Sequence, residues 1–266
     1  MTSETCVCGA AEYRERLKTT NGTSGQQYVI AECKNCGLVR TLPPPDTTQY
    51  HSGYAPTTHD AQFTGKLHDD WSAQVARFVR DHSQGTSFLD VGCSVGNLVV
   101  EASKLGFSAE GIDVDPIATE EARRAGRPVR TAGIEDVAGK YDVVVANHVL
   151  EHIGDLRTFL TEVFRLLEPG GRFFVLSPNR KGLIARLRRG RWMGWVPSEH
   201  VWHFTPQTLG PTVERASSLR TVSCTSRGVI EGPAGGVAGL GIRALTVTSK
   251  ALGRGDQVEG IFERPT

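Results

Sequence analysis

Long hydrophobic runs are missing from this chain of 266 residues. No apolar stretch approaches the roughly 20 residues that a helix needs to cross a bilayer. Residues 1–12 also lack the basic segment followed by an apolar one that is typical of a signal peptide. These absences argue against a membrane partner and predict a cytoplasmic protein. The length suits one large domain, or one domain with a small appendage.

An excess of charge of either sign is missing as well. Thirty basic side chains stand against 29 acidic ones, which gives a formal net charge of +1. A protein with so little net charge is not built to hold polyphosphate by electrostatics alone, so a histone-like or wholly electrostatic DNA binder is excluded. Hydrophobic residues make up 39% and charged residues 22%, the balance of a globular rather than a disordered protein.

Cysteine is scarce over most of the chain, but four of the six cysteines lie in residues 1–45. Thiols stay reduced in the cytoplasm, so these cysteines predict metal binding or incidental burial before disulfides. Cys6 and Cys8 form one pair, and Cys33 and Cys36 form a second. Four thiolates in two pairs suit a tetrahedral Zn²⁺ with a structural role. Outside these pairs, Cys93 is expected to be a small buried residue.

Two alternatives to this zinc site stay open. The first pair of cysteines has a spacing one residue shorter than the second, which makes it a less comfortable chelate. His51 or His59 could therefore replace Cys6 as a ligand. The competing interpretation is four reduced thiols without a metal.

The chain divides by composition into three parts. Residues 1–45 form a small zinc-ribbon-like head that ends in three consecutive prolines, and residues 46–84 form a linker with a lid helix. Residues 85–266 alternate short apolar runs with helical stretches, which predicts an α/β fold with a doubly wound parallel sheet. Within that domain, an insert at about residues 180–210 is placed to cover the crevice.

The strands and helices of this domain are expected at defined ranges. The predicted strands are Ser87–Val91, Ala109–Asp113, Pro128–Thr131, Tyr141–Ala146, Arg172–Ser177, Thr221–Thr225 and Gln257–Glu263. The predicted helices are Asn97–Leu105, Pro116–Ala125, Asp155–Leu167 and one from Pro206. A further helix carries an apolar face from Phe63 to Val79, and the glycine-rich residues 228–241 are expected to form a loop.

A turn rich in small residues follows the strand that ends near Asp90. Gly92, Ser94 and Gly96 lie between this strand and the helix that begins at Asn97. Such a turn brings a ligand close to backbone N–H groups at the carboxyl edge of a parallel sheet. By itself the pattern also fits a tight turn in which glycine supplies a positive φ.

Polar residues after the next strands favour a cofactor site over a simple turn. Asp113 ends the following strand about twenty residues after the glycine turn, where a carboxylate can accept hydrogen bonds from both ribose hydroxyls. Asp115 could instead cap the next helix. Glu135 follows the third strand, and Asn147 ends the fourth.

Taken in order and at these intervals, the segments resemble the class I S-adenosylmethionine-dependent methyltransferases from about Trp71 onward. The resemblance implies a Rossmann-like sheet of seven strands and a reaction that yields S-adenosylhomocysteine. Carried over position by position, it assigns the cofactor to Asp90, Gly92, Ser94, Gly96, Asp113, Val114, Ile134, Glu135, Asn147 and His148. Ser94 replaces a usual second glycine, and Gly133 replaces an acid that reads the adenine amino group in many relatives.

The whole layout, with its zinc-ribbon head and the later segment from Trp195 to Leu209, resembles a subgroup of these enzymes. Members of that subgroup often act on small molecules, including sugars and secondary-metabolite intermediates. Some dimerise, so a homodimer stays open. The resemblance implies the reaction class but not the acceptor.

A hydroxyl or ammonium acceptor needs a general base with a pKa near the working pH, and histidine suits that task. His200 is the first candidate, His148 the second and His203 the third. Each has a structural alternative: His203 can be a packed ring, and Glu151 with His152 can cap a helix or pair with each other. Tyr50 and Tyr54 are candidates for a lid over the cofactor.

One run of basic residues lies between Arg180 and Arg191. Its simplest interpretation is a solvated helix face. Arginines that point inward would suit a phosphate or a carboxylate on the acceptor.

Three hypotheses follow. The favoured one is an S-adenosylmethionine-dependent methyltransferase for a small-molecule acceptor, with O- or N-methylation and a structural zinc. The second is an RNA methyltransferase whose head binds the substrate, against which the near-zero net charge argues. The third is a protein that binds the cofactor without methylating. The sequence leaves open the acceptor, the methylated element, the base and the oligomeric state.

Overall fold

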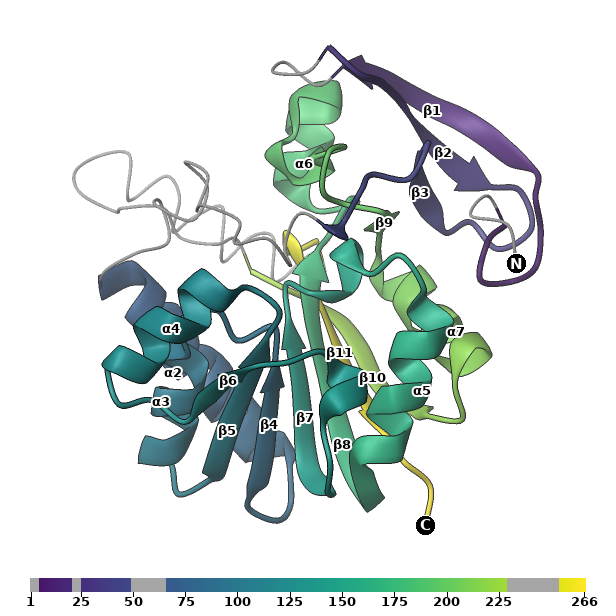
Figure 1. Cartoon of the computed structure of the whole chain (residues 1–266). Helices are drawn as coiled ribbons and strands as arrows, with labels where there is room; N and C mark the ends of the chain where they lie inside the picture. Colours follow the sequence, from purple (N-terminus) through teal and green to yellow (C-terminus); the bar gives the residue numbers. More distant parts are fainter. Residues whose placement is uncertain (1–4, 21–24, 49–65, 229–253) are drawn as a thin grey trace. The chain divides into compact units, whose positions relative to one another are not determined.

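The computed structural model describes residues 5–20, 25–48, 66–228 and 254–266 (Figure 1). Backbone contacts divide the chain into two compact units. The first contains residues 1–47, 148–160 and 175–261, and the second contains residues 48–147, 161–174 and 262–266. None of the helices in the described ranges is long and apolar enough to cross a membrane.

A seven-stranded sheet has the order β10-β11-β8-β7-β4-β5-β6, which confirms the predicted α/β fold. Its strands are β4 (Ser87–Val91), β5 (Ser108–Asp113), β6 (Val129–Thr131), β7 (Tyr141–Asn147), β8 (Leu167–Pro178), β10 (Arg220–Arg227) and β11 (Gln257–Glu263). β4 pairs in parallel with both β5 and β7, and β5 pairs in parallel with β6. Four consecutive residues of β7 from Val143 are fully buried, as expected for a strand covered on both faces.

Three helices of the second unit lie beside β4, β5 and β6: α2 (Lys66–His82), α3 (Asn97–Lys104) and α4 (Pro116–Arg124) (Figure 1). α2 buries Val75 and Val79 completely, in agreement with the predicted apolar face. Cys93, Val99, Ala122 and Val129 form a buried cluster that joins α3 and α4 to β6. Cys93 is therefore a small core residue, as the sequence predicts.

A second, four-stranded sheet lies in the first unit, in the order β1-β2-β3-β9. Its strands are β1 (Tyr13–Thr20), β2 (Gln27–Cys33), β3 (Val39–Leu42) and β9 (Trp202–His203). β3 pairs antiparallel with β9, so Val39 faces His203 and Arg40 faces Trp202 in register. The sheet of the N-terminal segment therefore includes residues that lie more than 160 positions later in the sequence.

The remaining elements are short helices and the two longer helices α5 and α7. They are η2 (Ile134–Asp136), η3 (Leu150–His152), α5 (Leu156–Leu166), α6 (Leu183–Arg188), η4 (Arg189–Arg191), η5 (Met193–Trp195) and α7 (Pro206–Ala216). α7 begins at the predicted Pro206, because the Thr205 hydroxyl accepts a hydrogen bond from the Thr208 N–H and proline suits the first helical position.

Several sequence predictions need correction. β8 begins at Leu167 rather than at Arg172, because the chain stays extended there: the Gly170 N–H donates to the Arg264 carbonyl and the Gly171 carbonyl accepts from the Arg264 N–H. β1 was not predicted, since its exposed, charged residues lack an apolar alternation and it forms only by pairing with β2. Residues 150–152 form a 3₁₀ turn instead of opening a helix, and the helix begins at Leu156. Several positions that the sequence analysis singled out lie outside the described residues: Tyr50, His51, Tyr54, His59, Phe63 and most of residues 228–241.

Candidate functional site

The turn after β4 has an unusual backbone. Gly92, Ser94 and Gly96 all have positive φ values, of 73°, 49° and 78°. The N–H groups of Gly92 and Cys93 both donate to the Ile112 carbonyl, at 2.8 and 3.0 Å. A Cβ on Gly96 would stand 2.7 Å from Val129 Cγ2, so this position needs glycine for space as well as for conformation.

Asp113 closes the turn from the next strand. Its Oδ2 accepts a hydrogen bond from the Ser94 N–H at 2.7 Å, and its Oδ1 accepts one from the Asp115 N–H at 2.9 Å. Asp115 accepts bonds from the first N–H groups of α4, so it is the cap of that helix. The sequence left open whether Asp115 caps this helix, and the hydrogen bonds show that it does. The structure leaves Asp113 as the carboxylate beside the turn.

Two carboxyl groups lie close together at this edge of the sheet. Asp90 is 3% exposed, and burial together with the nearby Asp113 raises its pKa well above the usual range. Burial also raises the pKa of Asp113, although the two N–H groups that it accepts counteract this. A bound cation would favour the ionised forms of both carboxyl groups, which burial disfavours.

The neighbouring strand ends contribute the remaining polar groups of this unit. Ile134 is buried in η2, and the Glu135 carboxylate lies 2.4 Å from where a Cβ on Gly133 would stand. The missing side chain at Gly133 is therefore what makes room for Glu135. At the end of β7, the buried Asn147 Oδ1 has no hydrogen-bond partner within the described ranges. A ligand that supplies a donor would satisfy this acceptor.

His148 begins a hydrogen-bonded series in the first unit. Its φ of 58° is rare for a residue with a side chain. Its Nδ1 lies 3.1 Å from Glu151 Oε1, and the Ser177 hydroxyl donates to Glu151 Oε2 at 2.9 Å. Burial alone would raise the pKa of Glu151, but the His148 hydrogen bond and the surrounding histidines hold it at about 2. Glu151 is thus an ionised carboxylate, so Nδ1 carries the proton in the neutral ring.

The other ring nitrogen of His148 faces Gln257. Its Nε2 lies 2.9 Å from the Gln257 side-chain nitrogen, and Gln257 is fully buried in β11. The sequence analysis missed Gln257, because a lone glutamine at the start of a strand carries no local signal. It missed the Glu151–His148 pair as well, and expected Glu151 and His152 to cap a helix or to pair with each other.

The other histidines of the first unit are held by backbone and hydroxyl groups. His152 Nδ1 lies 3.2 Å from the Glu199 carbonyl, and His200 Nδ1 lies 2.9 Å from the Gly194 carbonyl. The two rings meet edge to face, and their nitrogens and the Glu151 carboxylate lie within 4.8 Å of one another, close enough to hold a metal ion. Burial lowers the pKa of His152 to about 4.

His203 is a packed ring of the kind that the sequence analysis weighed against catalysis. Its Nε2 lies 3.0 Å from the Thr41 hydroxyl, and its ring contacts Trp195 at 5.0 Å between centroids. Burial lowers its pKa well below the usual range. A ring that stays neutral and enclosed is suited to packing.

The four N-terminal cysteines come together. Cys6 and Cys36 are 3.5 Å apart at sulfur, Cys8 and Cys33 are 3.6 Å apart, and all four sulfur atoms lie within 4.8 Å of one another. A Zn²⁺ with four bonds of about 2.3 Å to sulfur separates the ligands by about 3.8 Å, so the cluster fits this ion. The short spacing of Cys6 and Cys8 is accommodated by a turn in which the Gly9 N–H donates to the Cys6 carbonyl.

A family model described as a methyltransferase domain matches residues 63–216, which is more than half of the chain. The chain belongs to the class I S-adenosylmethionine-dependent methyltransferases. The matched residues include the turn after β4, Asp113 and Asn147. They also include the hydrogen-bonded residues His148, Glu151 and Ser177. The resemblance of the sequence to this family is therefore confirmed.

Two similar proteins are ubiquinone biosynthesis O-methyltransferases. The one from Methylobacterium nodulans is 32% identical over 168 residues, 58% of this chain and 66% of that protein. The mitochondrial one from Homo sapiens is 35% identical over 164 residues, 52% of this chain and 43% of that protein. The chain thus spans less than two thirds of the length of these relatives.

Solved methyltransferase structures share the fold. An S-adenosylmethionine-dependent methyltransferase from Archaeoglobus fulgidus has a TM-score of 0.57 at 17% identity, covering 77% of this chain and 98% of that one. Magnesium protoporphyrin IX methyltransferase from Synechocystis, solved with bound S-adenosylhomocysteine, has a TM-score of 0.53 at 15% identity and covers 82% and 93%. These likenesses confirm the Rossmann-like sheet of the methyltransferase.

The run of basic residues between Arg180 and Arg191 is mainly exposed to solvent, in agreement with the simplest interpretation of the sequence. Arg186, Arg188, Arg189 and Arg191 are exposed. Arg180 is the inward-pointing member, and its guanidinium lies 3.7 Å from Glu32. That arginine is engaged by a carboxylate of the chain itself, so it provides no support for a phosphate or carboxylate on the acceptor.

Proposed function

We propose that this protein transfers a methyl group from S-adenosylmethionine to an oxygen atom of a small-molecule acceptor. The observation that carries the proposal is the turn after β4, which the Asp113 carboxylate locks by accepting the Ser94 N–H at 2.7 Å. This arrangement of backbone amides and a carboxylate fits a nucleoside with two ribose hydroxyls. The names of the two ubiquinone biosynthesis O-methyltransferases support oxygen as the methylated element.

The residues present suit each part of the cofactor. Asp113 would accept the ribose hydroxyls, Ile134 and Glu135 would border the adenine, and Asp90 and Asn147 would face the cationic methionine end. Gly92, Ser94 and Gly96 would let the cofactor approach the backbone, with Val114 beside Asp113. S-adenosylmethionine, when bound, supplies a methyl group on a positively charged sulfur.

His148 is the residue best placed to act as the general base. The ionised Glu151 holds its Nδ1–H, so the lone pair lies on Nε2, where an acceptor hydroxyl would replace the Gln257 amide that lies 2.9 Å away and then give up its proton. Glu151 then stabilises the imidazolium that forms. His148 directly follows Asn147 in the chain, which keeps it at the carboxyl end of β7. His200 was the first candidate from the sequence, but it is buried with its Nδ1 at the Gly194 carbonyl.

The second part of the proposal is a structural zinc ion held by Cys6, Cys8, Cys33 and Cys36. Cys6 and Cys33 are buried, and burial raises the pKa of Cys6 and raises that of Cys36 to about 11. A bound cation favours the thiolate forms that burial disfavours. Four thiolates would complete the coordination of the metal, so this site would stabilise the head without taking part in chemistry.

Calorimetric titration with S-adenosylmethionine and S-adenosylhomocysteine tests the cofactor site, and elemental analysis of the same sample tests the zinc. We expect micromolar binding of both ligands and one zinc per chain. An acceptor screen with sugars and phenols, read as S-adenosylhomocysteine release, then tests methyl transfer, with His148→Gln as the inactive control. Folded protein that binds neither ligand would overturn the proposal.

A further inference from the structure

Arg127 has a position that the proposed reaction does not yet use. Its guanidinium donates to the Val95 carbonyl at 2.5 Å and to the Asn97 side-chain oxygen. Val95 belongs to the turn after β4, and Asn97 is the first residue of α3. Within the described ranges Arg127 forms no ion pair with a carboxylate, so its donors serve this turn. A guanidinium that binds neutral oxygens orients them strongly, because charged donors make the stronger hydrogen bonds.

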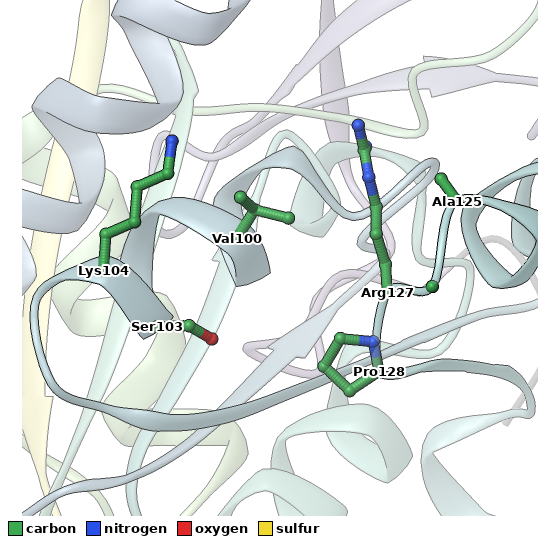
Figure 2. Close-up of a pocket in the computed structure, with 7 residues that line it drawn as sticks. Val100, Ser103, Lys104, Ala125, Arg127 and Pro128 are labelled. Carbon is green, nitrogen blue, oxygen red and sulfur yellow. The ribbon is translucent and has the colours of Figure 1, made fainter.

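The backbone of Arg127 is held by two hydrogen bonds. Its N–H donates to the Ala122 carbonyl at 3.0 Å near the end of α4, and its carbonyl accepts the Val129 N–H at 2.8 Å. Its side chain runs along a groove of about 590 Å³ beside α3, where Ser103 and Lys104 lie nearby (Figure 2). The Arg127 Cδ stands 3.6 Å from the place where a Cβ on Gly96 would be. Both the aliphatic part of the Arg127 side chain and its guanidinium therefore lie against the turn.

The turn needs such support because its conformation is costly. Three residues with positive φ lie within five positions, and one of them is Ser94. Gly96 caps α3 with no side-chain hydrogen bond, and its N–H donates to the Cys93 carbonyl at 2.8 Å, so Arg127 holds the other side of the peptide between Val95 and Gly96, the Val95 carbonyl. Without Arg127 only the N–H side of this peptide would be held, and cofactor binding would have to fix the orientation of the Val95 carbonyl.

We infer that Arg127 is a positioning residue that holds the turn in its cofactor-binding conformation before the cofactor arrives. This inference rests on the proposed function, since it assigns Arg127 to the same cofactor site. Arg127 acts through Val95 and Asn97 rather than by touching the acceptor. Its loss should therefore weaken cofactor binding and leave the acceptor step unchanged.

Calorimetric titration with S-adenosylhomocysteine tests the inference on four proteins: the wild type, Arg127→Met, Arg127→Lys and Lys104→Met. Arg127→Met should raise the Kd about tenfold, because it loses two charge-assisted hydrogen bonds. Arg127→Lys keeps the charge with a single donor group and should recover part of the affinity. Lys104→Met lies along the same groove, but its ammonium pairs with Glu101 and not with the turn, so its Kd should not change.

The outcomes separate the inference from the proposed function. A wild-type protein that does not bind S-adenosylhomocysteine would overturn both. A wild type that binds, with an Arg127→Met variant that is folded and binds equally well, would overturn the inference alone. If Arg127→Met fails to fold, Asn97→Ala removes one of the two acceptors, and unchanged binding in that variant would have the same consequence. With an acceptor in hand, Arg127→Met should raise the KM for S-adenosylmethionine at constant kcat.

Discussion

The cysteine cluster and the turn after β4 are two proposed ligand sites that the chain builds from different atoms. In the cysteine cluster, four side chains supply the ligand atoms, and short backbone turns bring them together. In the turn after β4, the backbone presents the donors, and side chains such as Asp113 and Arg127 hold it in place. Substitutions in the first site should therefore remove the ligand outright, whereas those in the second should have graded effects.

The largest effect is expected in the cysteine cluster. Cys33→Ser should reduce the zinc content from one per chain to near zero, because a hydroxyl does not replace a thiolate in a closed tetrahedral site. The N-terminal segment should then become sensitive to limited proteolysis. Elemental analysis and protease digestion measure both. Cys224→Ser, in β10 and outside the cluster, should keep its zinc, and a Cys33→Ser variant that also keeps it would contradict the site.

Asp113 should give the largest effect in the turn. Asp113→Asn keeps only one acceptor oxygen, so it cannot hold the Ser94 N–H and also accept two ribose hydroxyls. We expect the affinity for S-adenosylhomocysteine to fall about 100-fold, measured by calorimetry. Asp115→Asn is the matched control, because asparagine caps a helix about as well as aspartate. Equal affinities in the two variants would show that the Asp113 carboxylate does not hold the cofactor.

Glu151→Gln should separate catalysis from cofactor binding. A neutral amide cannot stabilise the imidazolium or fix the tautomer of His148, so kcat should fall about 100-fold or more. The Kd for S-adenosylhomocysteine should stay unchanged. Glu162→Gln is the control, since its carboxylate pairs with Arg165 on α5. Full activity in Glu151→Gln would rule out His148 as a base that depends on this carboxylate.

Asp90→Asn should stabilise the protein without cofactor at neutral pH. The raised pKa means that the folded state holds the Asp90 proton more tightly than the unfolded state does. Wild-type stability therefore falls as pH rises from the unfolded value, about 3.9, through the folded one. The advantage of Asp90→Asn should grow over the same range and then level off. Thermal unfolding between pH 5.5 and about 8.5 checks this, and a constant difference would contradict it.

The smallest effect is expected at Ser94. Ser94→Gly suits the φ of 49° and keeps the N–H that Asp113 accepts, so stability should change by about 1 kcal/mol or less. Binding of S-adenosylhomocysteine should persist. Ser94→Val places a β-branched residue at the same φ and should lower both stability and affinity. If valine is tolerated as well as glycine, backbone conformation does not limit this site.

Local sequence was sufficient for the elements whose signals are contained within a few residues. β4 and β11 have their predicted bounds, and α3, α4 and α7 begin where the cap and proline signals place them. The proposed cofactor residues could also be predicted from the sequence, because in a parallel sheet the ends of successive strands meet at one edge. The order of the segments along the chain thus sufficed to bring Asp90 and Asp113 together.

Contacts between distant segments were decided by the tertiary structure alone. β9 is two residues long and exists only because β3 pairs with it, and β1 is too polar to be recognised without β2. Gln257 and Arg127 gain their roles from neighbours 109 and about 30 positions away. Hydrogen bonds of this kind depend on where the backbone places each side chain in space. The sequence by itself therefore determined the family and predicted the cofactor residues, and only the folded chain favours His148 among the histidines as the proposed base.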